Sequence, residues 1–493
     1  MRKTNLHRAM AVLLPLLLLG CSKEPQITTR SQQALQFYKV GLSQWEKFYY
    51  PEAQYAFDEA IRLDSNFAMA WARRAMVDDG TQNHAKARQD IAHSMSLLKS
   101  VSEYEQMFIR LQNDRLNYSN TNAAALADSM LRLYPDDREI HLIRGNLYEL
   151  DKNVDDAIRS YQRAMRIDTS YALAVMSLGY AYSSIGEQEK AVEQMERYIR
   201  LVPDAADPRA SFADILMRVG RYDEALEQYK RSLELKPDYW YSANQIGGIY
   251  AQEGRLKEAE AQFHKGMESL PESQELKATH LAIDGDLNLL RGSFKEAVSQ
   301  FEEALRIDSL NNEAAYGLAS AFRKLNEFTR AHEVVARIHA ELERRHLLSS
   351  QYMLKYNLAK SRLLLDEGEF EGARALCDTA FEYTTALTRG PVFQQIADID
   401  LRSKQYEGVF DACEEALRVN PNYPDVLLTL AKAYHARGDS AMTREISGRL
   451  LGFWKNADSD FVNLRDLRKL LGEKRPAPAS SGSVSGKVAV QAQ

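Results

Sequence analysis

The sequence contains few of the residues that interrupt helices. Among its 493 residues are only 13 prolines and 24 glycines. Proline lacks the backbone N–H that a helix interior needs, and glycine in a helix interior costs conformational entropy. Their scarcity predicts a mostly helical chain.

The sequence also lacks an excess of basic residues. It has 63 Lys and Arg against 69 Asp and Glu, so its formal net charge is −6. Binding to nucleic acid generally requires a basic face. The acidic balance therefore argues against general nucleic-acid binding.

Motifs of the common enzyme classes are missing as well. No G-x-S-x-G, P-loop or G-x-G-x-x-G sequence occurs. His332 and Glu333 begin an H-E-x-x-H-like sequence, but Ala336 replaces its second histidine, so the zinc-binding pair is incomplete. His332, His339 and His346 recur every seven residues, which on a helix separates them by about 10 Å, too far to bind one ion. We therefore predict no catalysis, no metal site and no cofactor.

A long apolar run is absent except near the N-terminus, at residues 11–19. This run is shorter than the roughly 20 residues that a transmembrane helix needs. Three basic residues precede it, and the sequence LLGC, which ends at Cys21, follows it. The pattern resembles a bacterial lipobox, which implies cleavage of residues 1–20 and acylation of Cys21. An ordinary signal peptide with an incidental cysteine stays open as the alternative.

Loss of this segment removes three of the 63 basic residues, so the mature chain would carry 60 against 69 acidic ones, a net charge of −9. Residues 21–30 would then form a short lipidated tether. A chain anchored in this way belongs to the cell envelope, and the outer membrane facing the periplasm is the location we expect.

The most regular feature of the sequence is a period of 34 residues. The recurring residues are Ala157, Ala191, Ala225 and Ala259; Pro135, Pro203, Pro237 and Pro271; and Gly186, Gly220 and Gly254. Segments such as SLGYAYSSIGEQEKAVEQMERYIRLVP, residues 177–203, resemble the tetratricopeptide repeat, whose helix–turn–helix unit has this length and pattern.

The recurring residues have mechanical roles in such a unit. Gly145, Gly179, Gly247 and Gly285 would allow the paired helices to approach closely, because larger side chains there would overpack the crossing. Aromatic residues such as Tyr161 would fill the interior of each pair, and the 34-spaced glycines would form the turns between the helices.

The resemblance implies an all-α fold, a right-handed α-solenoid of about twelve tetratricopeptide-like units with a C-terminal capping helix. The units begin near Ala34, Ala68, Tyr104, Arg138, Ala172, Ala206, Trp240, Ala278, Asn312, Leu354, Gly390 and Pro424. Residues 31–275 would form an N-terminal array of units one to seven, and residues 276–457 a C-terminal array of units eight to twelve. Residues 458–472 would form the capping helix and residues 473–493 a disordered tail.

In this family, ligands usually contact the first helix of each pair, which lines the concave side of the solenoid. The corresponding residues are Met176, Tyr180, Asp207, Asp214, Arg218, Tyr241, Asn244, Gln252, Asp286, Tyr316, Arg323 and Lys324. We expect Tyr180, Tyr241 and Tyr316 to contribute most, as exposed aromatic side chains of a groove. The lysine and asparagine pair with which some members hold a carboxylate is not present, so binding of chaperone tails is not implied.

Cys377 and Cys413 occupy equivalent positions in the second helices of adjacent units. Such positions lie about a helix diameter apart, roughly 10 Å, whereas a disulfide requires Cα atoms within about 7 Å. We predict two buried free thiols, with a disulfide as the alternative.

The sequence thus predicts a membrane-anchored envelope scaffold or adaptor that binds protein or peptide partners through the concave face of the solenoid. The alternative is a glycan-binding lipoprotein for nutrient capture, a class that also carries tetratricopeptide pairs on a lipid anchor. The nearly unbroken array and the wide separation of Trp45, Trp71, Trp240 and Trp454 favour the scaffold.

Overall fold

The structure is a computed structural model that describes residues 27–81, 83–268, 270, 272–344, 352–384 and 388–473. The predicted signal peptide, Cys21 and residues 474–493 of the predicted tail lie outside these residues. Within them the chain forms 25 α-helices and one short 3-10 helix, Leu98–Ser100, and no strand. None of the described helices is both long enough and apolar enough to span a bilayer.

The first 24 α-helices form twelve consecutive pairs. The first helices of the pairs are α1 (Gln32–Trp45), α3 (Ala68–Gly80), α5 (Glu103–Leu116), α7 (Arg138–Leu150), α9 (Ala172–Ser184), α11 (Asp207–Arg218), α13 (Trp240–Gln252), α15 (Gln274–Arg291), α17 (Asn312–Lys324), α19 (Tyr352–Glu367), α21 (Gly390–Arg402) and α23 (Pro424–Ala436). The second helices are α2 (Tyr50–Leu63), α4 (His84–Ser96), α6 (Asn120–Leu133), α8 (Val154–Ile167), α10 (Gln188–Leu201), α12 (Tyr222–Leu235), α14 (Leu256–Glu268), α16 (Phe294–Ile307), α18 (Phe328–Arg344), α20 (Phe370–Phe381), α22 (Tyr406–Val419) and α24 (Ser440–Phe453). A last helix, α25 (Val462–Leu470), follows the twelfth pair. The predicted fold, a solenoid of about twelve units with a capping helix, is confirmed.

In several pairs the two helices pack closely where a glycine of the first helix faces an aromatic ring of the second. A Cβ atom on Gly145 of α7 would lie 2.3 Å from the ring of Tyr161 on α8, and one on Gly285 of α15 would lie 2.5 Å from the ring of Phe301 on α16. Tyr161 and Phe301 are fully buried. The recurring glycine is therefore the space into which the aromatic side chain of the second helix packs.

The turns inside the pairs share a left-handed residue. In six pairs this residue is a glycine with φ between 73° and 86°: Gly186, Gly220, Gly254, Gly292, Gly368 and Gly438. Five other pairs use a residue with a side chain there: Phe48, Tyr118, Lys152, Asn326 and Lys404. The backbone geometry of the unit is thus kept even where glycine is absent, at a steric cost.

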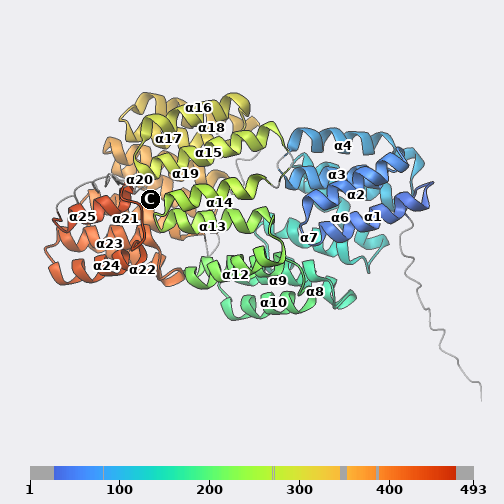
Figure 1. The fold of residues 1–493 in the computed structure, drawn as a ribbon, viewed down its shortest axis with the longest axis horizontal. Coiled ribbons are helices and arrows are strands. Elements are labelled where there is room, and N and C mark those ends of the chain that lie inside the picture. The colour runs from blue at the N-terminus through green and yellow to red at the C-terminus, as the bar shows by residue number, and fades with distance from the viewer. Residues whose placement is uncertain are drawn as a thin grey trace, which may run out of the picture.

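The solenoid returns against itself, so that helices far apart in the sequence lie side by side (Figure 1). The Asn422 side chain donates to the Gly220 backbone oxygen at 3.0 Å. The indole of Trp454 donates to the Gln252 backbone oxygen at 3.0 Å, and the Asp458 amide donates to the Gly254 oxygen at 2.8 Å. We call this line of contacts, between the turns after α11 and α13 and the segments before α23 and α25, the seam.

Three of the turn glycines lie in the seam or beside it. A Cβ atom would lie 2.1 Å from Asn420 Oδ1 at Gly220, 2.5 Å from Phe461 at Gly254, and 2.7 Å from Arg465 at Gly292. At Gly186, Gly368 and Gly438, which have the same left-handed backbone, a Cβ atom would meet nothing within 4 Å. The first three glycines therefore serve the packing between turns of the solenoid as well as their own turns.

The end of the predicted tether is bound to the folded protein. Thr28 donates to Glu105 through its amide at 2.8 Å and its hydroxyl at 2.5 Å. Thr29 and the Arg30 amide donate to Asp64 at 2.6 and 2.9 Å. Residues 28–30 therefore pack against the folded helices.

Cys377 and Cys413 are buried and free, as predicted. Cys377 lies 3.4 Å from the Ser361 hydroxyl, and Cys413 faces the Val426 backbone oxygen at 3.9 Å. Burial raises the pKa of Cys377 to about 11 and that of Cys413 to about 12. Both thiols therefore act as small apolar residues of the core.

Candidate functional site

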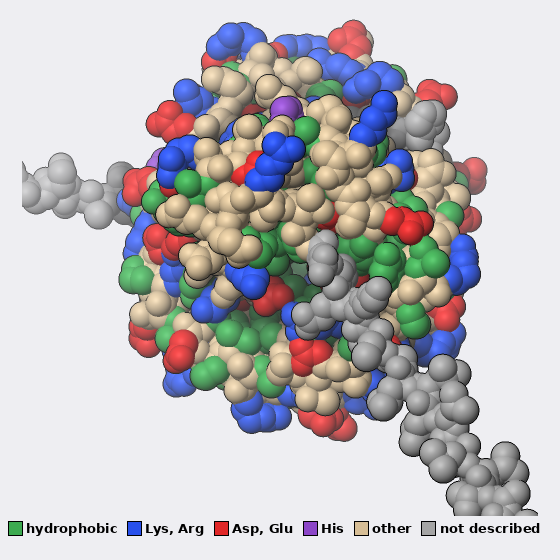
Figure 2. Space-filling view, turned by 90° about the vertical axis from the view of Figure 1, so that its right-hand side faces the viewer, with side chains coloured by type: hydrophobic (Ala, Val, Ile, Leu, Met, Phe, Trp, Pro, Cys, Tyr) green, Lys and Arg blue, Asp and Glu red, His purple; other side chains and the backbone are tan. Residues whose placement is uncertain are grey.

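The first helices form the inner side of the solenoid. Consecutive first helices pack against one another, for example α3 with α5, α15 with α17 and α21 with α23, whereas the described second helices make no comparable contacts with each other. The first helices therefore lie at the smaller radius. A view of the N-terminal end shows a hollow in which hydrophobic side chains gather, with acidic and basic side chains at its edge (Figure 2).

Three of the predicted groove residues meet at one buried carboxylate. Asp214 on α11 accepts hydrogen bonds from the hydroxyls of Tyr180 on α9, at 2.6 Å, and Tyr241 on α13, at 2.7 Å. It also accepts from the Tyr229 hydroxyl on α12 and, at 3.4 Å, from the Gln245 amide. Only 8% of Asp214 is exposed. The carboxylate is surrounded by neutral donors, which satisfy its oxygens without a cation.

This cluster corrects one expectation about the aromatic residues. Tyr180 and Tyr241 are half-buried rather than exposed, because their hydroxyls turn inward to Asp214. Burial raises the pKa of both hydroxyls, and the neighbouring Asp214 raises it further. The two tyrosines therefore present ring faces and edges to the groove while their polar ends are already used.

A second buried carboxylate, Asp207, lies seven residues before Asp214, at the start of α11. Asp207 accepts from the hydroxyls of Tyr198 and Tyr239 at 2.8 and 2.7 Å and from Ser211 at 3.2 Å. Burial raises the pKa of Asp207 to about 6, against the lowering effect of these donors. Because only 7% of Asp207 is exposed, it supports the groove from within and does not line its surface.

A cavity of about 540 Å³ lies between α11 and α13 on one side and the C-terminal helices on the other. Charged and polar residues of its wall are Asp214, Arg218, Tyr222, Tyr241, Gln245, Gln252, Asn420, Tyr423, Asp425 and Asn463. Apolar residues of its wall are Met217, Ala251, Leu290, Pro391, Ala416, Val419, Pro424 and Phe461. We call it the interturn cavity, because successive turns of the solenoid supply its two walls.

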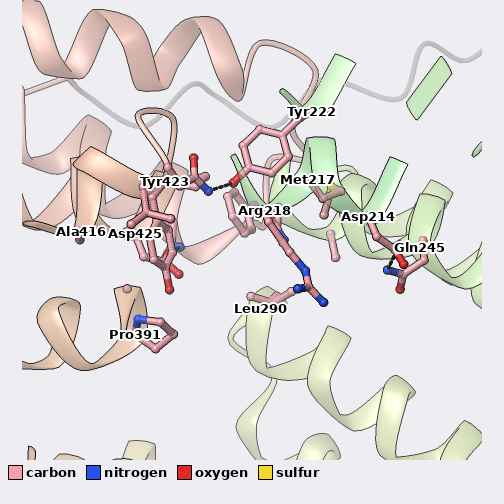
Figure 3. A pocket seen from close by; sticks show the side chains of 18 of the residues that line it. Asp214, Met217, Arg218, Tyr222, Gln245, Leu290, Pro391, Ala416, Tyr423 and Asp425 are labelled. Carbon is pink, nitrogen blue, oxygen red and sulfur yellow. Dashed lines mark hydrogen bonds between the residues drawn. The ribbon is translucent and has the colours of Figure 1, made fainter. Parts of the chain in front are cut away.

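The interturn cavity holds one charged side chain on each wall in addition to the satisfied Asp214 (Figure 3). Arg218 extends from the end of α11 toward Leu290, with its guanidinium group 5.3 Å from the Tyr180 ring centre. Asp425, in the first turn of α23, accepts a hydrogen bond from Asn463 at 3.1 Å. A hydrogen bond of 2.8 Å from Asn420 to Tyr222 joins the walls at the seam.

The other predicted site residues lie outside this cavity. Met176 and Asn244 are half-buried on α9 and α13, and the Asn244 side-chain oxygen has no hydrogen-bond partner. Tyr316 on α17 donates to the Tyr352 backbone oxygen at 3.4 Å. Arg323, also on α17, forms an ion pair of 2.5 Å with Asp366. Arg323 is therefore already used within the protein.

Asp286 on α15 occupies an intermediate environment. Its side chain is accessible to water, although protein surrounds it on most sides. Partial loss of hydration raises the pKa of Asp286 to about 7, Glu313 raises it as well, and Lys355 opposes the shift.

The residues of the opposite wall were not predicted. They lie 200 or more residues after Arg218 in the sequence: Asn420, Tyr423, Asp425 and Asn463. The hydrogen bond from Asn422 to Gly220 likewise joins residues 202 positions apart. No local pattern could have found them, because their position depends on where the solenoid meets itself. In the described residues, no group of three or more His, Cys, Asp or Glu could hold a metal ion.

Comparison with known proteins supports the repeat architecture. Residues 119–172 and 172–204 match tetratricopeptide repeat families, and residues 209–344 match a family described as the TT21 fifth ARM repeats domain. No curated protein sequence matches the chain, and no enzyme family is indicated.

Solved structures of repeat proteins resemble parts of the chain. A tetratricopeptide repeat protein from Parabacteroides merdae ATCC 43184 is 17% identical, with a TM-score of 0.41, over 53% of this chain and 98% of that one. Two structures of MamA are 27% and 26% identical, each with a TM-score of 0.27, over 32% and 36% of this chain and 93% of theirs. The family matches and the twelve helix pairs together show that the chain contains tetratricopeptide repeats within a longer solenoid of helix pairs.

Proposed function

We propose that this protein is a lipid-anchored scaffold of the cell envelope that binds protein or peptide partners through the concave face formed by its first helices. Tetratricopeptide repeats are protein-interaction modules in general. The observation that carries the proposal is the packing of consecutive first helices at the smaller radius, around a hollow of hydrophobic side chains with charged side chains at its edge (Figure 2).

Several basic side chains on the outer second helices are paired. Arg62, Arg306 and Arg344 each bind a glutamate three residues earlier on the same helix, at distances of 2.5 to 2.8 Å. On the inner first helices, Arg218 and Lys432 make no hydrogen bond or ion pair with any described residue. The concave face thus includes basic side chains without a hydrogen bond or ion pair among the described residues, and acidic groups of a partner would supply such contacts.

The membrane anchor rests on Cys21. Thr28, which is bound to Glu105, follows Cys21 by only seven positions. Fully extended, seven residues reach about 25 Å. An acyl chain on Cys21 would therefore hold the first three helix pairs next to the membrane, on the periplasmic side of the outer membrane in our proposal.

The partner role is tested by photo-crosslinking in cells. A crosslinking amino acid replaces Gln252 on the inner helix α13 in one variant and the exposed Glu193 on the outer helix α10 in the other. We expect discrete protein adducts from position 252 and few from position 193. Equal adducts from both positions, or none from position 252, would contradict binding through the concave face.

The anchor is tested separately by mass spectrometry of the protein from membranes. We expect the mature chain to begin at Cys21 with added acyl groups, and the Cys21→Ser variant to leave the membrane fraction. An unmodified Cys21, or membrane association that survives its replacement, would disprove the anchor without affecting the partner role.

A further inference from the structure

The interturn cavity carries opposite charges on its two walls. Arg218 comes from α11, near the middle of the chain, and Asp425 comes from α23, near its end. Neither forms an ion pair of 4 Å or less with a described residue. The two charges therefore face the same space without neutralising each other.

The surroundings of Arg218 leave its donors available. Asp214, one turn earlier on the same helix, already accepts from Tyr180, Tyr229 and Tyr241. Glu149 on α7 is the other acidic neighbour, and it forms no ion pair of 4 Å or less with Arg218. The Tyr180 ring lies 5.3 Å from the guanidinium carbon and so restricts the orientation of the side chain. A guanidinium group held against an aromatic ring, with its N–H groups toward an open cavity, suits a carboxylate.

The Asp425 carboxylate also has an acceptor without a hydrogen-bond partner among the described residues. Asn463 donates to one of its two carboxylate oxygens, and the other accepts nothing from the described residues. Its charged neighbours are Arg362 on α19, Asp398 on α21 and Lys432 on α23 itself. Burial raises the pKa of Asp425, and Asp398 adds to the shift, while Arg362 and Lys432 oppose it. A cationic N–H donor in the cavity would relieve the cost of this buried charge.

The space between the two charges suits a small chain. Leu290, Pro391 and Val419 supply apolar surface, and the Gln252 and Asn420 side chains supply amide groups of the kind that bind peptide backbones. The volume of about 540 Å³ lies within the range of roughly 300 to 1,000 Å³ that is typical of small-ligand sites.

We propose that the interturn cavity binds a short zwitterionic peptide, with its terminal carboxylate on Arg218 and its terminal ammonium on Asp425. Because the two charges belong to different turns of the solenoid, the bound peptide connects them across the seam. The inference deepens the proposed function at the same surface, yet it concerns a small ligand and can be tested without any protein partner.

The test is isothermal titration calorimetry of the purified full-length mature chain in detergent with three tripeptides. The probes are Ala-Leu-Ala with free ends, its N-acetylated form and its C-amidated form. We expect the free peptide to bind and each blocked form to bind at least about tenfold more weakly, the effect of losing one charge-assisted hydrogen bond of about 1.4 kcal/mol or more.

Two substitutions assign the ends of the peptide. In Arg218→Gln, amidation of the peptide should no longer weaken binding, whereas acetylation still should. In Asp425→Asn, the reverse should hold. Arg166→Gln on α8 and Asp411→Asn on α22, which remove exposed charges of the outer helices, should leave all three affinities unchanged, and far-ultraviolet circular dichroism should show that every variant is folded.

Failure of the free peptide to bind, or binding that ignores both blocking groups, would overturn the proposal. Equal sensitivity of both substituted proteins to both blocking groups would also overturn it, because Arg218 and Asp425 would then not hold separate ends. Crosslinks from position 252 to a protein partner would persist in either case, so failure here is distinguishable from failure of the scaffold role.

Discussion

Replacement of Gly254 by alanine measures how much the seam stabilises the protein. Gly254 has φ of 73°, so any L-residue there is strained by roughly 1–2 kcal/mol. Alanine would add a second cost, because its Cβ would lie 2.5 Å from Phe461 and 2.7 Å from the Cβ of Ala457. Overpacking of this kind typically costs about 1–3 kcal/mol.

Gly186→Ala is the matched control. Gly186 has φ of 85° in the equivalent turn, and a Cβ atom there would meet nothing within 4 Å. It therefore carries the backbone cost of about 1–2 kcal/mol alone. We expect Gly254→Ala to lower the free energy of unfolding by about 1–3 kcal/mol more than Gly186→Ala, the contribution of overpacking at the seam.

Urea unfolding followed by circular dichroism gives the difference in stability, and hydrogen exchange read by mass spectrometry locates it. The peptide that covers α25 (Val462–Leu470) should exchange faster in Gly254→Ala and at the parent rate in Gly186→Ala. Equal destabilisation by the two substitutions, or unchanged protection of α25 in both, would refute the reasoning that the seam is a stabilising contact.

Four further outcomes are expected. Gly145→Ala should lower the free energy of unfolding by about 1–3 kcal/mol, because its Cβ would meet the Tyr161 ring at 2.3 Å; a melting temperature equal to that of the parent would contradict this packing. Lys404→Gly should raise the free energy of unfolding by about 1 kcal/mol, because it relieves a side chain held at φ of 63°, and urea midpoints measure the gain. Cys377 and Cys413, with pKa values raised to about 11 and 12, should resist alkylation at pH 8 until urea unfolds the chain, as mass spectrometry can show; rapid labelling of the native protein would disprove their burial. The raised pKa of Asp286, about 7, means that the folded protein bears the cost of its charge at high pH and that protonation favours folding. Asp286→Asn should therefore stabilise the protein above pH 7 and have a shrinking effect as the pH falls toward 4, which melting curves across this range would test.

The sequence was sufficient for the repeat and for the helices because both depend on local spacing. The glycine and the aromatic ring of one pair are 16 residues apart, as in Gly145 and Tyr161, and the turn glycines repeat with the period. Even the degenerate units keep the geometry, as the left-handed backbone at Lys404 shows. Periodicity therefore specifies the fold here.

The candidate site was only half predictable. Family resemblance located Tyr180, Asp214 and Tyr241 on the first helices, but their hydrogen-bonded arrangement depends on side-chain packing across three pairs. The facing wall with Asp425 depends on the accumulated twist of the intervening units. Small rotations summed over several pairs decide which residues meet, and no single stretch of sequence records that sum.

The seam also limits how this array can change its length. In an open solenoid, a pair of helices can be inserted or lost with only its two neighbours affected. Here one extra pair between α14 and α23 would displace Asn422 and Asp458 from Gly220 and Gly254, the residues whose backbone oxygens they bind. The number of units in this stretch is consequently fixed by contacts between distant parts of the chain.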